Sequence, residues 1–169
     1  MIHLRFAAAA LGAVLSMPAF AQESTTVTLR NADGDDVTTL TLSDAGHGIL
    51  VTGTLSGVEP GPHAIHFHEV GKCEPPFESA GGHLNPTGKQ HGLLNHAGHH
   101  AGDLPNIVMP EEGQGAIQLF ADGVALAVGQ EGSLRDDDGT AVIIHAGPDD
   151  YKTDPSGNSG DRIACGAID

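Results

Sequence analysis

The sequence predicts an all-β domain, a turn-rich sandwich or barrel of about eight short strands. Short runs of β-branched and apolar residues recur along the chain, and clusters of turn-forming residues separate them. No segment has the apolar spacing that is typical of an amphipathic helix. The 169 residues include 24 glycines and 10 prolines, which favour many turns over long helices.

The expected strands follow from these runs in chain order. Residues 25–30 and 37–43 flank the sequence NADGDD, whose Asp-Gly step is typical of a β-hairpin. Residues 48–55 form a third strand, and a fourth begins at His63, after the breaker GVEPGP. The later strands are expected at residues 104–109, 115–120, 141–145 and 163–168.

Two segments are too long for ordinary turns, about 33 residues at 71–103 and about 16 residues at 146–161. Loops of this length are usually functional or disordered. Both are too rich in glycine and polar residues to form a core of their own, so another interaction must organise them. They also hold most of the residues that could bind metals.

Residues 1–21 have the features of a cleaved signal peptide. Arg5 precedes an apolar run at residues 6–17, and the AFA sequence at residues 19–21 fits the small-x-small rule for cleavage. The alternative, a membrane anchor, needs a longer run to span about 30 Å of hydrocarbon. We therefore predict an exported chain in which residues 22–169 form a single domain.

The cysteines indicate the redox state of the chain, and the net charge excludes some classes of partner. Export makes a single disulfide between Cys73 and Cys165 the expectation, with two free thiols as the alternative. The formal net charge of −15 argues against nucleic acid and against anionic membranes as partners. High net charge also keeps an exported protein soluble.

Three histidines fall within the sequence HAIHFHEVGKC, which begins at His63. Side chains two residues apart on a strand face the same way, so His66 and His68 project together as a pair of candidate metal ligands. His63 is out of register with them, and we expect it to hydrogen-bond to backbone on the opposite face. The alternative is a polar strand that carries histidines without a metal.

A second group of candidate ligands lies in the first long segment: His83, His91, His100 and Asp103. Three imidazoles and one carboxylate make a complete tetrahedral zinc set, with no position left for water. His145 ends the apolar sequence AVIIH and is free to complete a site with His66 and His68. An imidazole-rich site with an open position favours copper, whereas the closed set with a carboxylate suits zinc.

The motifs HFHE, GGHLNP, KQHG, HAGDLPN, IIHAG and DRIACG resemble those of the copper/zinc superoxide dismutase family, in the same order and at similar spacing. The resemblance extends over almost all of residues 22–169. It implies an eight-stranded antiparallel Greek-key β-sandwich or barrel with two long functional loops. It also implies a bacterial enzyme of antioxidant defence, secreted into the periplasm, that converts superoxide into oxygen and hydrogen peroxide. The cofactors would be one copper ion and one zinc ion per chain.

Position by position, the resemblance assigns each candidate ligand to a metal. The copper ligands would be His66, His68, His83 and His145. The zinc ligands would be His83, His91, His100 and Asp103. His83 would therefore bridge the two metals.

The resemblance also gives roles to residues outside the metal sets. Asp149 matches an aspartate that hydrogen-bonds one copper histidine and one zinc histidine, here His66 and His91; a solvated loop carboxylate is its alternative reading. Arg162 matches the arginine that guides the superoxide anion, and His83 would supply one of the two protons. Cys73 and Cys165 match the family disulfide, which pins the long loop to the last strand.

Two departures from the family pattern leave alternatives open. His96 and His99 are extra histidines, and the sequence does not determine whether they bind further metal. The family spaces its last zinc histidine three residues before the aspartate, which favours His100, with His99 as the alternative ligand. The segment before His83 is short, so the sequence leaves a homodimer and its type undecided.

Two other functions fit the same fold. A periplasmic metal buffer would explain the extra histidines but would not need Arg162. A copper-delivery protein would need an exposed cysteine pair or a methionine cluster, and the sequence has neither. For an enzyme acting on an anion, attraction in so acidic a chain must be local. Lys72, Lys89 and Lys152 of the long segments either assist Arg162 or are simply exposed loop lysines.

Overall fold

A computed structural model describes residues 22–168, and over this range the predicted all-β class is confirmed. The described residues form nine strands and one short 3-10 helix, η1. The elements are β1 (Ser24–Arg30), β2 (Asp36–Asp44), β3 (Gly48–Leu55), β4 (Gly61–His63), β5 (Ile65–His68), η1 (Glu78–Ala80), β6 (Ile107–Met109), β7 (Gly115–Asp122), β8 (Thr140–His145) and β9 (Arg162–Ile168). The predicted signal peptide lies outside the described residues.

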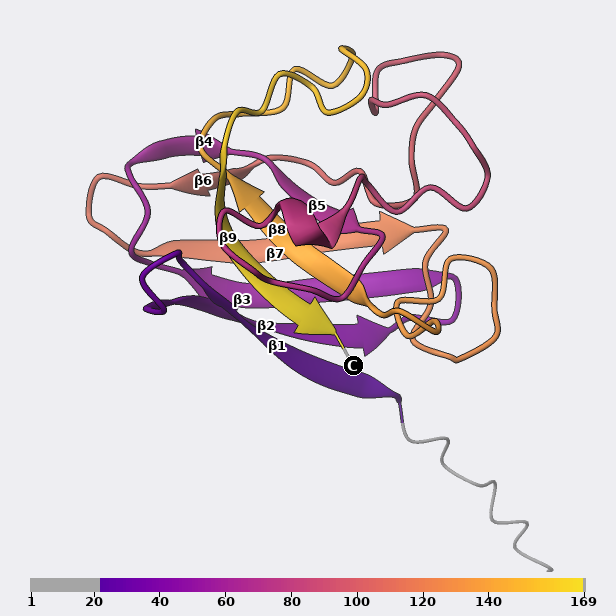
Figure 1. Cartoon of the computed structure of the whole chain (residues 1–169). Helices are drawn as coiled ribbons and strands as arrows, with labels where there is room; N and C mark the ends of the chain where they lie inside the picture. The colour runs from indigo at the N-terminus through magenta and orange to yellow at the C-terminus, as the bar shows by residue number, and fades with distance from the viewer. Residues whose placement is uncertain (1–21, 169) are drawn as a thin grey trace, which may run out of the picture.

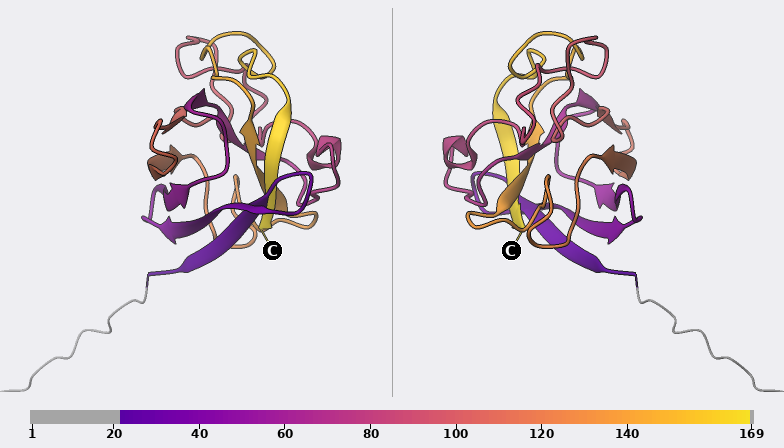
Figure 2. Two further views of the ribbon diagram at one scale, coloured as in Figure 1. Left: turned by 90° about the vertical axis from the view of Figure 1, so that its left-hand side faces the viewer. Right: turned by 90° about the vertical axis from the view of Figure 1, so that its right-hand side faces the viewer.

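Seven strands form one antiparallel sheet in the order β5-β8-β9-β1-β2-β3-β7. The sheet curls into a half-barrel, and the short β4–β6 pair lies alongside β7 (Figures 1 and 2). The chain leaves β3 for β4, β5 and β6 before β7 returns to pair with β3, which is a Greek-key connection.

The prediction of a single strand from His63 onward is wrong, because this strand divides at Ala64. β4 pairs with β6, whereas β5 pairs with β8. Ala64 leaves both ladders, since its N–H donates to the Gly147 carbonyl and its own carbonyl accepts from the N–H of His145. This division gives nine strands in the described chain instead of the eight that we predicted.

The core fills the inside of the half-barrel, and alternate residues of each strand point into it. On β2, Leu40 and Leu42 are completely buried, whereas Thr39 is exposed and Thr41 is half-buried. Burial of such a leucine stabilises the fold by about 1.5–3 kcal/mol. On β5, Phe67 belongs to this core, so His66 and His68 face the other way.

The two long connections meet at one end of the half-barrel, at the top of Figures 1 and 2. Residues 69–106 join β5 to β6, and residues 146–161 join β8 to β9. They contact each other directly: the N–H of His91 donates to Asp154 Oδ1 at 2.7 Å, and the N–H of Leu94 donates to the Tyr151 carbonyl at 3.1 Å.

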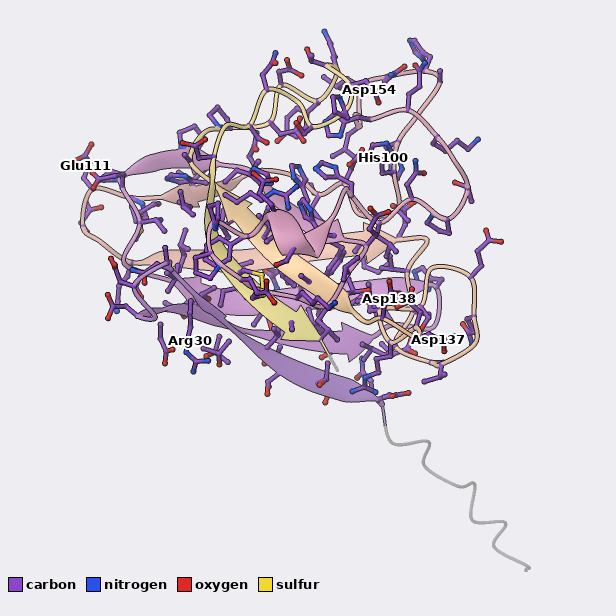
Figure 3. All side chains as sticks on the ribbon, viewed as in Figure 1. Arg30, His100, Glu111, Asp137, Asp138 and Asp154 are labelled. Carbon is purple, nitrogen blue, oxygen red and sulfur yellow. A yellow bond between two sulfur atoms is a disulfide. The ribbon has the colours of Figure 1, made fainter. Side chains whose placement is uncertain are left out.

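A third long connection, residues 123–139 between β7 and β8, was not predicted. It packs on the core through Leu126 and Leu134, which are both completely buried. Its outer part carries Asp137 and Asp138, at the right of Figure 3. Hydrophobic contacts therefore organise this loop, and Leu84 and Leu104 likewise anchor part of residues 69–106 in the core.

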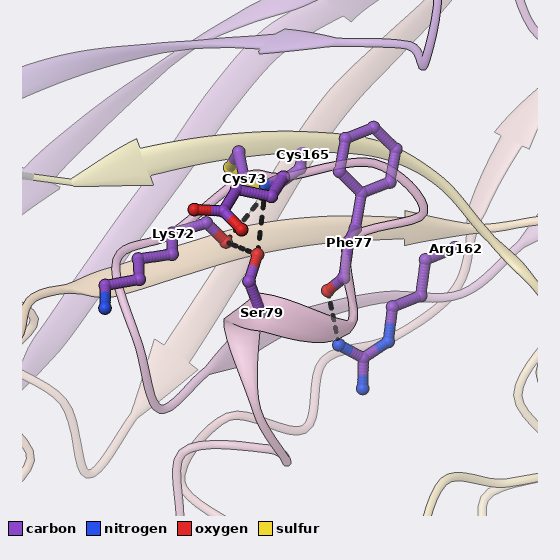
Figure 4. Close-up of a disulfide and its surroundings, with 7 residues drawn as sticks. Lys72, Cys73, Phe77, Ser79, Arg162 and Cys165 are labelled. Carbon is purple, nitrogen blue, oxygen red and sulfur yellow. Dashed lines mark hydrogen bonds between the residues drawn. A yellow bond between two sulfur atoms is a disulfide. The ribbon is translucent and has the colours of Figure 1, made fainter.

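The predicted disulfide is confirmed: Cys73 is bonded to Cys165, 92 residues further along the chain. It ties the first long loop to β9, as Figure 4 shows. In the chain-entropy view, a loop of this size gives on the order of 4–5 kcal/mol of stabilisation. Among residues 22–168, no helix is long and apolar enough to cross a membrane.

Candidate metal centre

Neighbouring strands and the first long loop bring four histidines together. His66 and His68 project from the same face of β5, and His145 ends β8, the strand that pairs with β5. His83 reaches the group because its backbone forms an isolated bridge with His68. One ring nitrogen from each of the four lies within 4.8 Å of the others, and all four side chains are buried.

The four histidines each have one buried ring nitrogen without a hydrogen-bond partner. These atoms are Nδ1 of His66 and Nε2 of His68, His83 and His145. An unpaired buried polar group costs about 1–3 kcal/mol, so four of them converging on one point need a common partner. A transition-metal cation that accepts imidazole ligands fits this set, and copper is the first-row divalent ion with the highest affinity for such ligands.

The opposite ring nitrogens are held by the protein. His66 Nε2 lies 2.8 Å from Asp149 Oδ2, His68 Nδ1 lies 3.0 Å from the Gly81 carbonyl, and His145 Nδ1 lies 3.1 Å from the Gly160 carbonyl. Such bonds fix the orientation of each ring and leave the other nitrogen free to bind a metal.

Three histidines of the first set, His68, His83 and His145, are unprotonated at neutral pH. Burial, together with the neighbouring histidines, lowers the pKa of His68 to about 2 and that of His145 to about 3. Burial also lowers the pKa of His83 to about 4, although Asp103 opposes the shift. The nitrogen lone pairs are therefore available to a metal without competition from protons.

The second set gathers around the carboxylate of Asp103. Its Oδ1 lies 2.8, 3.0 and 3.2 Å from Nδ1 of His83, His91 and His100 respectively. Its Oδ2 accepts the N–H groups of Gly92 and His100. Burial raises the pKa of the Asp103 carboxyl, but the hydrogen bonds from the three histidines outweigh it and hold this pKa well below its usual range.

Three imidazole nitrogens and one carboxylate oxygen form the closed tetrahedral donor set that structural zinc prefers. These four ligand atoms also lie within 4.8 Å of one another. His83 belongs to both sets, with Nε2 directed to the first and Nδ1 to the second. The arrangement fits one imidazole shared between two metals.

Asp149 lies between the two sets and is not a solvated loop carboxylate. It is 4% exposed, its Oδ2 lies 2.8 Å from His66 Nε2, and its Oδ1 lies 3.0 Å from His91 Nε2. Burial lowers the pKa of His91, but the hydrogen bonds to Asp103 and Asp149 outweigh it and raise this pKa to about 9. Asp149 thus links one ring of each set.

Arg162 lies beside the first set, held by the loop that the disulfide anchors. Its Nη1 donates to the Phe77 carbonyl at 2.7 Å (Figure 4). Its Nη2 donates to the Gly81 carbonyl, also at 2.7 Å. Gly81 also accepts from His68 Nδ1, so the arginine and this histidine share one carbonyl. Arg162 and three histidines of the first set line an open cavity of about 1060 Å³.

The lysines do not join Arg162 in the lining of this cavity. Arg162 is the single lysine or arginine among the described residues that line it, so Lys72, Lys89 and Lys152 add no charge to the cavity wall itself. Four carboxylates lie in the lining instead: Asp33, Glu69, Glu78 and Asp161. Any attraction for an anion at the cavity wall therefore depends on one guanidinium.

The remaining histidines of residues 22–168 lie outside both sets. His63 is buried, with its ring nitrogens each 2.8 Å from the carbonyl oxygens of His145 and Glu59, as predicted for a structural histidine. His99 Nδ1 lies 2.7 Å from the His100 carbonyl, and it is His100 that joins the second set. His100 itself lies in the first long loop, in the upper part of Figure 3.

Sequence reasoning missed Asn106 and Tyr151, which contact the loop of Asp149. The Asn106 side chain bonds to the Asp149 backbone, and the Tyr151 hydroxyl accepts the N–H of Asn106. Asn106 ends the motif HAGDLPN, which could have drawn attention to it, but neither residue has a side chain that typically binds metal.

Comparison with known proteins decides the family. The model of the family described as copper/zinc superoxide dismutase (SODC) matches residues 36–168. The chain belongs to the copper/zinc superoxide dismutase family. The Cu-Zn superoxide dismutase 2 of Aquifex aeolicus is 47% identical over 142 residues, which are 83% of each chain. The Cu-Zn superoxide dismutase of Caulobacter vibrioides is 44% identical over 86% of this chain and 85% of its own.

A solved structure shows the same fold. The crystal structure of a superoxide dismutase-like protein from Bacillus subtilis superposes with a TM-score of 0.82 at 40% sequence identity, covering 88% of this chain and 99% of that one. Copper/zinc superoxide dismutases use copper and zinc, and the two donor sets described above fit one ion of each kind.

Proposed function

We propose that this protein is a copper/zinc superoxide dismutase that converts two superoxide anions and two protons into oxygen and hydrogen peroxide. One observation carries the proposal: four buried, unpartnered ring nitrogens converge beside an arginine at an open cavity, and one of those rings also belongs to a closed second set. The activity would serve antioxidant defence.

The first set would hold copper through His66, His68, His83 and His145. The second would hold zinc through His83, His91, His100 and Asp103. When bound, copper supplies the one-electron oxidation and reduction of superoxide, whereas zinc has no redox chemistry and stabilises the site.

Arg162 would bind the substrate. Superoxide is a small anion, and the guanidinium is always charged, with N–H donors beyond the two that Phe77 and Gly81 already use. Because these two carbonyls fix the head group, its charge stays at the cavity wall next to His68. Arg162 therefore orients the anion without reorganising.

His83 would handle one of the two protons that form hydrogen peroxide. Its Nε2 is buried without a partner in the first set, and its Nδ1 is engaged by Asp103 in the second. The His83 ring also lines the cavity, so a proton held on its Nε2 would lie next to the bound anion.

We further propose that residues 1–21 direct export and that the mature protein works in the periplasm. The Cys73–Cys165 disulfide supports this location, because such bonds persist in oxidising compartments. Sedimentation of the mature protein would distinguish a monomer from a homodimer.

The proposal is tested by measuring products. Protein loaded with copper and zinc should yield one oxygen and one hydrogen peroxide for every two superoxide anions consumed, with many turnovers per chain. A periplasmic metal buffer, the alternative that the extra histidines favour, would bind both metals. It would consume no more than one superoxide anion per bound copper ion.

A further inference from the structure

Asp149 touches one histidine of each set, yet it lies in residues 146–161, which contain no helix or strand. Its two carboxylate oxygens contact His66 and His91 at 2.8 and 3.0 Å. A shift of a few tenths of an ångström would weaken both contacts. The position of Asp149 must therefore be fixed by something outside the metal sets.

We infer that Asn106 is the positioning residue for Asp149, and that it thereby controls how tightly the second set retains zinc and how His66 is oriented in the first. This inference rests on the proposed assignment of zinc and copper to the two sets. It gives a role to a side chain that contacts neither metal set.

The geometry of Asn106 supports this role. Its Nδ2 donates to the Asp149 carbonyl at 2.9 Å, and its Oδ1 accepts the N–H of Asp149 at 2.9 Å. One amide therefore satisfies both backbone groups of a single residue. Two bonds in opposite directions fix the rotation of the Asp149 backbone as well as its position, which a single bond could not do.

Asn106 is itself anchored in the fold. It immediately precedes β6, and its neighbours Leu104 and Ile107 are 1% and 4% exposed in the core. The zinc candidate Asp103 lies three residues earlier on the same segment. Asn106 thus fixes the loop that carries Asp149 to a segment that is itself anchored in the core.

Tyr151 closes the arrangement from the other side. Its hydroxyl accepts the N–H of Asn106 at 2.8 Å, its own N–H donates to Asp149 Oδ1, and its carbonyl accepts the N–H of Leu94. Its backbone is left-handed, with φ at 63°, a conformation that non-glycine residues rarely adopt. Gly92 permits the close approach, because a Cβ there would clash with the Tyr151 carbonyl.

Removing the Asn106 amide should therefore loosen Asp149 while leaving every proposed metal ligand in place. Loss of a group that orients metal ligands from outside commonly lowers metal affinity by roughly tenfold to a hundredfold. The effect should appear first at His91, which Asp149 and Asp103 hold from opposite ring nitrogens. The first set should also be affected, because Asp149 orients the His66 ring that would bind copper.

The experiment measures zinc release from copper- and zinc-loaded protein to a colorimetric chelator. Asn106→Ala should release zinc at least roughly tenfold faster than wild type and shift the visible absorption of bound copper. Thr153→Ala is the matched control: it removes a side-chain hydrogen bond to Asp150 in the same loop, on the exposed side. Its zinc release and copper spectrum should match those of wild type.

Tyr151→Phe gives a second route to the same answer if Asn106→Ala does not fold. It removes only the hydroxyl that accepts from Asn106, so zinc release should accelerate by a smaller factor in the same direction. Unchanged zinc release and an unchanged copper spectrum in these variants would overturn the inference, as would an equal effect of Thr153→Ala. A wild-type protein that takes up no zinc would instead refute the metal assignment itself.

Discussion

Replacing Arg162 with glutamate tests how the protein binds its anionic substrate. Arg162 is the single lysine or arginine among the described residues that line the cavity, and it lies there with four carboxylates. Two unit charges about 4 Å apart interact by about 1 kcal/mol in bulk water, and by more near a protein surface. Replacing a positive by a negative charge changes the interaction energy by twice this amount. We therefore expect the second-order rate constant with superoxide to fall at least tenfold, which corresponds to about 1.4 kcal/mol in the activation free energy.

The assay is the second-order rate constant of metal-loaded protein, measured by direct decay of superoxide absorbance. Copper and zinc content should be unchanged in Arg162→Glu, because Arg162 belongs to neither donor set. Lys152→Glu makes the same change in net charge outside the cavity lining, and its rate should stay close to that of wild type. An unchanged rate for Arg162→Glu, or an equal fall for Lys152→Glu, would refute local attraction by Arg162.

Three other predictions follow from the site. Asp103→Ala should lose zinc and still bind copper, because the first set keeps all four imidazoles; full zinc occupancy by elemental analysis would contradict the assignment of Asp103. Thiol titration of the unfolded, unreduced mature protein should find no free thiol, and reduction of Cys73–Cys165 should lower the free energy of unfolding by a few kcal/mol. Glu78→Gln removes one carboxylate from the cavity lining and should raise the rate with superoxide by about twofold, whereas an equal or lower rate would show that this charge does not repel the substrate.

A local rule could predict part of the first donor set, whereas the inclusion of His83 in that set came from the resemblance. Alternation along a strand is enough to place His66 and His68 on one face, and the structure confirms it. Charge and size of the ligand types then separate an imidazole-rich set from one with a carboxylate. The choice of His100 over His99 as a zinc ligand came from the resemblance. In the structure, His100 Nδ1 contacts Asp103 while His99 Nδ1 contacts a carbonyl.

Features that depend on tertiary packing could not be predicted in the same way. The break at Ala64 arises because its backbone bonds to Gly147 and His145, more than eighty residues away. Likewise, nothing local shows that the lysines of the long loops stay out of the cavity lining. The role of Asn106 depends on contacts 43 residues distant in sequence, which no spacing rule reveals.

The three long loops look alike in sequence, but different contacts hold them in place. Residues 123–139 look as irregular as the other two connections, but buried leucines hold them. Residues 69–106 are held by core contacts of Leu84 and Leu104 and also by the disulfide. Bonds around Asp149 and the shared contacts of the two histidine sets hold both this loop and residues 146–161. We therefore expect these two loops to lose order first when metals are removed, by hydrogen exchange.

The central claim is tested most directly by selective reconstitution of the metal-free mature protein, with metal content and superoxide consumption measured on the same samples. We predict one copper and one zinc per chain after both are supplied, no activity with zinc alone, and full activity once copper is added. A protein that binds both metals in these amounts yet does not accelerate superoxide loss, or one that is active without copper, would contradict the account.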